Sequence, residues 1–155
     1  MDNSTKLDKW NAVKKSIDKK KFKQKIEIQR IYWVSIGQNI GSETYGKDKY
    51  FTRPVLVLCV FFNDTFLGVP LTSKVKNKTG RLYYKFTDSK SKAQVALLGQ
   101  IRVYDIKRAG AYLSKVNDDD FVKIKEKLKN EVIKIISPHK DGETYPCGQA
   151  DFSHY

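Results

Sequence analysis

Residues 53–62 constrain the fold of this 155-residue chain more than any other stretch. They read Arg-Pro-Val-Leu-Val-Leu-Cys-Val-Phe-Phe, a run rich in β-branched and aromatic side chains and too short to cross a membrane. Such a run predicts a strand that is buried on both faces. Turn-forming residues follow at 63–65, and a second apolar segment at 66–74 then returns. The two segments together predict an antiparallel hairpin.

The hairpin is expected to bring its two open ends together. Antiparallel pairing sets the start of one strand beside the end of the next, so Arg53 should lie near Thr72 and Ser73. A guanidinium beside two hydroxyls at a sheet margin suits an oxyanion or a phosphate. The alternatives are a salt bridge that pins the strand at Arg53 and a satisfied edge hydroxyl at Thr72. From the residues alone these alternatives are favoured, because both residue types are common at strand ends.

The charge of the chain favours a polyanionic partner. Thirty Lys and Arg against seventeen Asp and Glu give a formal net charge of +13. Nucleic acid, an acidic protein and an anionic membrane surface all fit this excess. A merely soluble, lysine-rich protein explains it equally well. A membrane protein is not expected, since the chain has no apolar run of about 20 residues and no signal-peptide core at its start.

Cysteine and histidine usage points away from metal chemistry. Cys59 and Cys147 have neither metal-ligand nor disulfide-framework spacing, which fits a reducing cytoplasm. His139 and His154 both come after the last convincing secondary-structure element. A zinc site or a paired-histidine active site therefore has little to build on, and no metal is expected.

Periodicity and breakers divide the chain into three parts. These are a basic N-terminal helical extension at 1–27, a compact domain at 28–137 and a flexible C-terminal tail at 138–155. Within the first two parts the expected elements are an amphipathic helix at 5–20, a strand at 28–36, a long loop at 37–52, the hairpin, a basic turn at 74–80, strands at 81–86, 93–98 and 111–116, and a helix from 118 to about 136.

The last helix has the clearest start signal. Asn117 precedes three aspartates, which combine a capping side chain with acids at the positive end of the helix dipole. The triple aspartate resembles a metal site, but capping is the favoured role. An apolar stripe follows, so the helix should pack on the sheet; it comprises Phe121, Ile124, Leu128, Val132 and Ile135.

Several short motifs occur in a recognisable order. They are Ile-Tyr-Trp-Val-Ser-Ile-Gly at 31–37, Asn-Ile-Gly-Ser-Glu at 39–43, Arg-Pro-Val-Leu-Val at 53–57, Val-Pro-Leu-Thr-Ser at 69–73 and Gln-Ile-Arg at 100–102, before a closing amphipathic helix. Over residues 30–136 the chain resembles the MazF/PemK (Kid) family of toxin endoribonucleases from type II toxin–antitoxin systems.

The resemblance implies a mainly β (α+β) fold: a small SH3-like antiparallel β-barrel with a C-terminal packing helix, here with an added N-terminal helix. It implies a homodimer that cleaves single-stranded RNA sequence-selectively, without a metal or cofactor, and that an acidic antitoxin neutralises. Arg53 and Thr72 match the family's catalytic positions. The other matches lie near the RNA groove: Ser73, Gln100 and Arg102, with Glu43 in the Gly-Ser-Glu loop.

This chain also departs from the family. Some members use an arginine, an aspartate and a loop histidine where it has Leu97, Gly99 and Ser42. These differences favour an arrangement built on Arg53 and Thr72. The loop before Arg53 is longer than usual, and the family does not explain the N-terminal helix. Two other functions stay open: a poison that binds DNA gyrase, as the similarly folded CcdB proteins do, and a non-catalytic nucleic-acid-binding member.

RNA supplies its own nucleophile, the 2′-hydroxyl, so an enzyme must deprotonate it, stabilise the phosphorane-like transition state and protonate the leaving 5′-oxygen. The expected products carry 2′,3′-cyclic phosphate and 5′-hydroxyl ends. Arginine is a poor base. The hypothesis therefore gives transition-state stabilisation to Arg53, with leaving-group protonation as an added option, and phosphate orientation to Thr72 and Ser73. The general base is unassigned, with Glu43 a weak candidate.

Loop aromatics and lysines are the further candidates for RNA contacts. Tyr50, with its neighbours Tyr45 and Phe51, is a candidate for base stacking, although aromatics that fold back over the barrel are the favoured interpretation. Lys74 leads a set of lysines suited to tracking phosphates; the others are Lys47, Lys49, Lys76 and Lys78. Trp10 and Trp33 are interpreted as helix and core packing.

Overall fold

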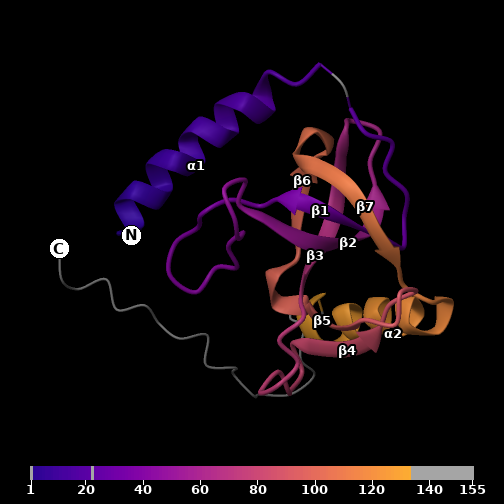
Figure 1. Ribbon diagram of the computed structural model, residues 1–155. Coiled ribbons are helices and arrows are strands. Elements are labelled where there is room, and N and C mark those ends of the chain that lie inside the picture. The colour runs from indigo at the N-terminus through magenta and orange to yellow at the C-terminus, as the bar shows by residue number, and fades with distance from the viewer. Residues whose placement is uncertain (1, 22, 134–155) are drawn as a thin grey trace, which may run out of the picture.

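In the computed structural model, which describes residues 2–21 and 23–133, a strongly bent antiparallel sheet carries one helix at each end of the chain (Figure 1). The elements in chain order are α1 (Asn3–Asp18), β1 (Arg30–Ser35), β2 (Thr52–Val60), β3 (Thr65–Thr72), β4 (Tyr83–Thr87), β5 (Ala93–Leu97), η1 (Leu98–Gln100), β6 (Arg102–Asp105), η2 (Ile106–Arg108), β7 (Ala109–Lys115), α2 (Asp118–Leu128) and the short π-helix η3 (Lys129–Ile133).

Strand β3 is the branch point of the sheet. The strands run in the order β4-β5-β3-β2-β1-β7, and β6 also pairs with β3. The first half of β3 pairs with β6, from Thr65 opposite Asp105 to Gly68 opposite Arg102. Its last residues pair with β5 instead. The sheet curls as the predicted mainly β fold requires, but strand pairing does not close it into a complete barrel.

The predicted hairpin is present as β2 and β3. Val55 lies opposite Pro70, and this register, continued outward by two residues, sets Arg53 opposite Thr72. The regular ladder ends here because Pro54 and Pro70 have no backbone N–H to donate. The end of the hairpin is therefore left as an open margin, with side chains from both strands close together.

The middle of β2 is buried on both faces, as its unbroken apolar pattern predicts. Val55 and Val57 belong to one core cluster with Tyr32 and Phe66. Leu56, on the opposite face, belongs to a second cluster that α2 covers. The ends of the strand, including Cys59, are half-buried, so the predicted burial on both faces applies to its middle and not to its ends.

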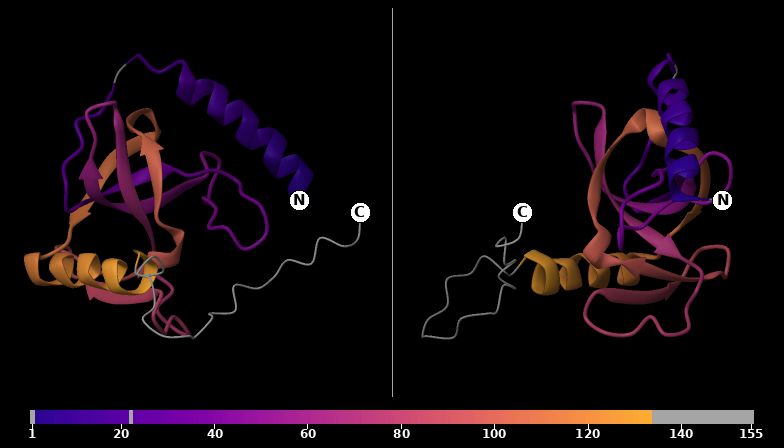
Figure 2. Two further views of the ribbon diagram at one scale, coloured as in Figure 1. Left: turned by 180° about the vertical axis from the view of Figure 1, so that it is seen from behind. Right: turned by 90° about the vertical axis from the view of Figure 1, so that its left-hand side faces the viewer.

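Helix α2 lies across β4 and β5, as Figure 2 shows from two further sides. Asn117 caps it, accepting a hydrogen bond of 2.8 Å from the N–H of Asp120, so capping by this side chain is confirmed. Phe121, Ile124 and Leu128 are buried in the core. The regular helix ends at Leu128, earlier than the periodicity predicts, and η3 continues it to Ile133. The predicted residues beyond that point, and the tail at 138–155, lie outside the described residues.

Helix α1 begins and ends two residues before its predicted bounds and docks through Trp10. That ring is 7% exposed and lies 5.6 Å from the ring of Phe51, centroid to centroid. Gly37 makes this approach possible, since a Cβ there would lie 2.5 Å from an atom of the indole. The rest of the predicted apolar stripe is not buried: Leu7 is exposed, and Val13 and Ile17 are half-exposed. Trp10 as helix packing is thus confirmed.

The long loop between β1 and β2 has a closed base. The Phe51 carbonyl accepts from Ile36 at 3.0 Å, and the Gly37 carbonyl accepts from Gly46 at 2.7 Å. Glycine is required at 46 because a Cβ would lie 1.7 Å from the Phe51 carbonyl oxygen. The loop has a defined path, which carries its middle residues back toward the open end of the hairpin.

Two strands differ from prediction. The segment Arg102–Asp105 forms β6, which the sequence did not predict, and β7 begins at Ala109, two residues earlier than expected. Each owes its position to a partner far away along the chain, β3 for β6 and β1 for β7.

Candidate active site

A pocket of about 160 Å³ opens at the end of the β2–β3 hairpin. Arg53, Thr72 and Ser73 all line it, so the structure brings together the three residues that the sequence placed at this margin. The residues that complete the lining are Trp33, Lys47, Asp48, Thr52, Pro54, Leu71, Lys92 and Gln94. We call this the Arg53 pocket.

Backbone carbonyls hold the Arg53 guanidinium in place. Its Nε donates to the Tyr45 carbonyl at 2.9 Å, and its Nη1 donates to the Leu71 carbonyl at 3.3 Å. Burial lowers the pKa of Arg53 below its ordinary value, while the nearby Tyr45 and Tyr104 side chains raise it. Arginine stays charged at neutral pH despite such a shift. The half-buried Arg53 cation therefore donates to neutral backbone carbonyls, and its remaining N–H groups can donate to an anionic ligand.

Thr72 contributes a hydroxyl with a defined hydrogen-bond direction. Its Oγ1 accepts from the backbone N–H of Lys74 at 3.2 Å. The hydroxyl hydrogen is therefore free to donate to a ligand. Ser73 lies next to it and is exposed, as is Lys74. One cation and two hydroxyls at one pocket suit the binding of a phosphodiester.

Asp48 is a carboxylate in this pocket that the sequence did not single out. Its Oδ2 accepts from the Thr52 hydroxyl at 2.6 Å, and its Oδ1 accepts from the Tyr50 N–H at 2.8 Å. A carboxylate has about four lone-pair positions, so each oxygen keeps acceptor capacity. Asp48 sits in the loop with a positive φ of 60°, and its approach to the pocket depends on how that loop folds. No local sequence motif predicts that Asp48 lies in the pocket.

Trp33 corrects a prediction. The sequence placed it in the core, but its side chain is 36% exposed and lines the Arg53 pocket. The alternation along β1 explains this, because Tyr32 and Val34 on either side point inward. The sequence did not show this, because residues 31–34 form an unbroken apolar run in which no polar residue marks the outer face.

Glu43 and Gln100 do not line the pocket. The Glu43 carboxylate turns back into its own loop and accepts from the Ile40 N–H at 3.0 Å. Gln100, in η1, accepts from the Thr44 N–H at 2.9 Å through its side-chain carbonyl. Thr44 precedes Tyr45, whose carbonyl holds Arg53. Gln100 is therefore connected to the pocket through the loop backbone.

The remaining predicted contact residues lie further out. The Arg102 guanidinium stacks on the Tyr104 ring at 5.0 Å from its centroid. Tyr50 is 55% exposed, and the Lys49 ammonium lies 5.0 Å from its ring centroid. Neither Arg102 nor Tyr50 lines the Arg53 pocket, although Tyr50 lines a larger hollow beside it.

A buried acid supports the back of the pocket. Asp88 is 6% exposed, and its Oδ2 accepts from Ser114 at 2.7 Å and from the Gln94 amide at 3.4 Å. Gln94 is 1% exposed and lines the pocket. The donors around Asp88 outweigh its desolvation: burial raises the pKa of Asp88, but hydrogen bonds from Ser114, Lys92, Lys90 and Gln94 bring it below its ordinary value.

The described part of the chain offers neither a metal site nor a membrane-spanning helix. Residues 2–21 and 23–133 contain no group of three histidine, cysteine, aspartate or glutamate side chains arranged to hold a metal ion. Over the same residues, neither helix has the length and apolar character that a membrane crossing needs.

The fold defines the structural class. The chain superposes on MazF from Deinococcus radiodurans with a TM-score of 0.56 and 21% sequence identity, covering 68% of this chain and 94% of that one. A mycobacterial endoribonuclease in complex with its cognate antitoxin gives a TM-score of 0.56 and 16% identity, covering 74% and 100%. At these identities the likeness shows a shared MazF-like fold.

The family follows from the sequence itself. The model of PemK-like, MazF-like toxins of type II toxin–antitoxin systems matches residues 27–132, so the chain belongs to this toxin family. The predicted family is confirmed. Among curated protein sequences, none matches the chain. The matched range leaves out α1.

Proposed function

We propose that this chain is the toxin of a toxin–antitoxin pair and acts as a metal-independent, sequence-selective endoribonuclease on single-stranded RNA. The observation that carries the proposal is the Arg53 pocket, where Arg53 meets Thr72 and Ser73 at the open end of the hairpin. Membership in a family of endoribonuclease toxins supports it.

The chemistry assigns Arg53 to the developing charge on the scissile phosphate. A guanidinium makes bidentate contacts with phosphate oxygens and is worth most when aimed at charge that forms in the transition state. Its Nε is held by Tyr45, and the Leu71 carbonyl steadies Nη1, so little reorganisation is needed. Thr72 donates its free hydroxyl hydrogen to a second phosphate oxygen, and Ser73 helps to orient the group.

We assign the general base to Asp48. Deprotonation of the 2′-hydroxyl needs an acceptor within reach of the substrate, and a carboxylate is a suitable group. Asp48 lines the pocket, whereas Glu43 is turned toward Ile40. The 2′-oxygen then attacks the phosphorus, the P–O5′ bond breaks, and the 5′-oxygen takes up a proton, from the Arg53 guanidinium or from water, and leaves as a hydroxyl. The products carry 2′,3′-cyclic phosphate and 5′-hydroxyl ends.

Around this centre we place the substrate contacts and partners. Arg102, Lys74 and Tyr50 extend RNA binding from the pocket, and Gln100 acts through the loop. The active species is a homodimer in the cytoplasm. An acidic antitoxin peptide suits the +13 chain and folds onto the RNA-binding surface. RNA and antitoxin should therefore compete; unchanged RNA affinity at saturating antitoxin would contradict this.

The deciding experiment is cleavage of a mixed pool of single-stranded RNA in EDTA, followed by sequencing of the cut ends. We expect cuts at one short sequence, with cyclic phosphate ends. Arg53→Ala should reduce cleavage by about 100- to 1000-fold while the far-UV circular dichroism is retained. Intact RNA with the wild-type protein would contradict the proposal, and trapped gyrase–DNA complexes would identify a gyrase poison instead.

A further inference from the structure

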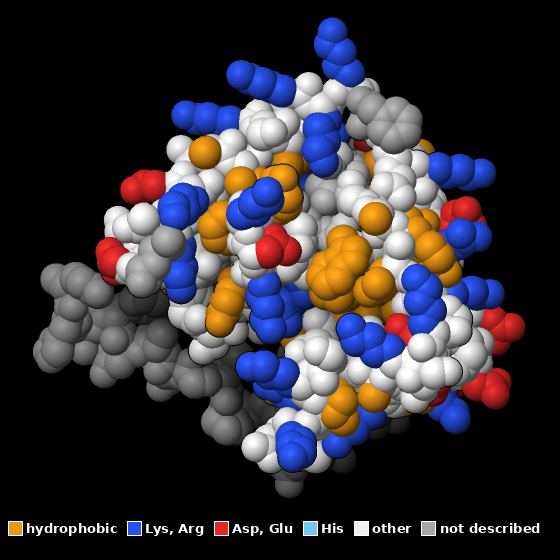
Figure 3. All heavy atoms as spheres, in the orientation of Figure 1, with side chains coloured by type: hydrophobic (Ala, Val, Ile, Leu, Met, Phe, Trp, Pro, Cys, Tyr) orange, Lys and Arg blue, Asp and Glu red, His pale blue; other side chains and the backbone are white. Residues whose placement is uncertain are grey.

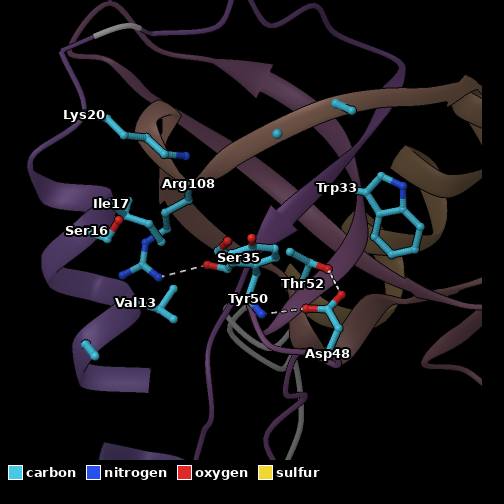
Figure 4. A pocket seen from close by; sticks show the side chains of 13 residues that line it. Val13, Ser16, Ile17, Lys20, Trp33, Ser35, Asp48, Tyr50, Thr52 and Arg108 are labelled. Atoms are coloured by element: carbon cyan, nitrogen blue, oxygen red, sulfur yellow. Dashed lines mark hydrogen bonds between the residues drawn. The ribbon is translucent and has the colours of Figure 1, made fainter. Parts of the chain in front are cut away.

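Helix α1 forms one wall of a large surface hollow. The hollow has a volume of about 690 Å³ and lies between α1 and the outer face of β1 and β7. Val13 and Ile17 of α1, with Lys20 just beyond the end of the helix, face it from one side; Trp33, Tyr50 and Arg108 face it from the other (Figure 4). We call this the α1 groove. Because α1 lies outside the matched family range, the family does not account for this feature.

The α1 groove runs directly into the Arg53 pocket. Trp33, Asp48 and Thr52 line both hollows. In Figure 4, Asp48 and Thr52 lie between Trp33 and the α1 side chains. A strand held at its scissile phosphate in the pocket must leave it on either side. One exit passes over Trp33 into the groove.

The side chains of the groove suit single-stranded nucleic acid. Trp33 and Tyr50 are 36% and 55% exposed, which leaves ring surface available for bases to stack on. Lys20 and Arg108 add positive charge to the same lining. The Arg108 guanidinium is fixed by donation to the Ser35 carbonyl at 3.1 Å and lies 5.5 Å from the Trp10 ring centroid.

Charge around the groove favours a polyanion. A neighbouring hollow shares Ala12 and Asp48 with it and is lined by four lysines, at 6, 9, 47 and 49. Asp48 is the one acid lining the α1 groove, and both of its oxygens already accept hydrogen bonds from within the loop. Figure 3 shows lysine and arginine side chains surrounding the exposed apolar side chains on this face.

Helix α1 is also held firmly enough to act as a wall. Besides the buried Trp10, the Lys20 ammonium donates to the Lys107 carbonyl at 3.1 Å, and the Lys107 ammonium donates to the Asp18 carbonyl at 2.9 Å. At the other end of the helix, the Gln38 amide donates to the Asn3 side chain at 2.8 Å. Both ends of α1 are thus fixed against the body of the protein.

We propose that the α1 groove is an extended RNA subsite, in which nucleotides flanking the cleaved bond stack on Trp33 and Tyr50 while Lys20 and Arg108 contact their phosphates. The proposal deepens the proposed function and rests on it. It gives α1 a role in substrate binding rather than in folding alone. An acidic protein segment is the competing occupant, and binding of poly-glutamate, measured beside binding of oligonucleotides, separates the two.

The test measures how affinity grows with oligonucleotide length. Fluorescently labelled 2′-deoxy oligonucleotides of about 4 and 12 nucleotides lack the attacking hydroxyl and stay intact, so anisotropy reports binding alone. The wild type should bind the longer one more tightly. Ala12→Trp fills the groove without removing a charge. It should reduce the ratio of the affinities for the longer and the shorter oligonucleotide by at least about tenfold, since each stacked base contributes about 1–3 kcal/mol.

A charge variant gives a second, independent readout. Lys20→Gln keeps a donor for the Lys107 carbonyl and should reduce the slope of log affinity against log salt by about 0.7 for the longer oligonucleotide. Lys15→Gln is the matched control, because Lys15 is an exposed lysine of α1 that is close to Lys20 in the chain but does not line the groove. Its slope should stay unchanged. Thermal unfolding checks that each variant folds.

The outcomes are distinguishable from those of the proposed function. If wild-type RNA cleavage occurs but Ala12→Trp and Lys20→Gln bind the longer oligonucleotide like the wild type, the subsite is refuted and the nuclease stands. If Ala12→Trp and Lys20→Gln lose binding to poly-glutamate while their oligonucleotide binding is unchanged, the RNA subsite is also refuted and the groove is identified as a protein-docking site. If the wild type fails to cleave RNA, the proposed function fails whatever the binding data show.

Discussion

The side-chain carbonyl of Gln100 accepts a 2.9 Å hydrogen bond from the backbone N–H of Thr44, joining η1 to the long loop. The next residue in the loop, Tyr45, holds Arg53 through its carbonyl oxygen at 2.9 Å. In the proposed mechanism Gln100 is a positioning residue, which is connected to the Arg53 pocket through two loop residues. This relationship explains how a side chain outside the pocket can affect catalysis.

Gln100→Ala should impair catalysis more than folding. Loss of one hydrogen bond should reduce the free energy of unfolding by about 1 kcal/mol. Displacement of Tyr45 and Arg53 should lower kcat by about 10- to 100-fold, because catalysis is sensitive to small misplacements. Single-turnover cleavage and urea unfolding measure the two effects. Gln38→Ala, which removes the exposed bond to Asn3, is the control and should leave kcat unchanged. Equal kcat losses in both variants would contradict the positioning role.

Asp48→Asn tests whether Asp48 or Glu43 is the general base. The amide keeps an acceptor for the Tyr50 N–H and a donor for the Thr52 hydroxyl, so the loop should hold its shape. Loss of the base should reduce kcat/KM by about 100-fold or more.

Glu43→Gln is the matched comparison, because it is the same change of acid to amide in the same loop. It should have little effect, since Glu43 bonds to Ile40 within the loop. The measurement is kcat/KM on one RNA oligonucleotide at fixed pH. A large loss with Glu43→Gln and none with Asp48→Asn would transfer the role to Glu43.

The hairpin and its open end were predictable because their signals are local. The apolar run of β2, the turn at 63–65 and the rule of antiparallel pairing suffice to bring Arg53 to Thr72. The helix α2 was predictable for the same reason, from Asn117 and the spacing of its apolar residues. Its end was not, because departure from regular helix geometry at Lys129 leaves no mark in the periodicity.

The parts that were missed depend on distant partners. Strand β6 has four residues and becomes a strand only by pairing with the first half of β3. Asp48 reaches the pocket because the loop closes at Gly37 and Gly46, a path that spacing does not encode. The α1 groove requires the docking of Trp10 against Phe51. An apolar stripe in the sequence predicts which face of a helix is apolar, but it does not predict the surface against which that face packs.

Asp88→Asn should make the stability of the protein less sensitive to acid. The pKa of Asp88 is depressed in the folded state, so its charge stabilises the fold above its ordinary pKa of 3.8, and this contribution is lost as pH falls through the folded-state value. The substitution should cost about 2 kcal/mol at pH 7, since it breaks several buried hydrogen bonds.

The cost of Asp88→Asn should shrink as the pH is lowered below about 4, where the wild type also loses the charge. Urea unfolding at a series of pH values measures it. Asp105→Asn is the control: Asp105 is exposed and accepts from the Lys107 N–H at 2.7 Å, a capping role that asparagine fills equally well. A cost for Asp88→Asn that is constant across this pH range would disprove the linkage.

Substituting phenylalanine for Tyr104 and for Tyr84 should change the free energy of unfolding in opposite directions. Tyr104 is 1% exposed, and its hydroxyl has no hydrogen-bond partner among the described residues, whereas the Tyr84 hydroxyl donates to Asp120 at 2.7 Å. Removing an unpaired buried hydroxyl should raise the free energy of unfolding by about 1 kcal/mol, and removing the paired one should lower it by a similar amount. Urea unfolding at pH 7 compares the two variants.

The stability advantage of Tyr104→Phe over the wild type should increase at alkaline pH. Burial raises the pKa of Tyr104 to about 12, although Arg102, Arg108 and Arg53 each act to lower it. The ionised phenol is therefore disfavoured in the folded state, and the wild type should lose stability as pH rises from about 10 towards 12. Tyr104→Phe lacks this loss, so its advantage over the wild type should grow over that range. An advantage that stays flat, or a variant less stable than the wild type at pH 7, would show that the hydroxyl finds a partner in solution.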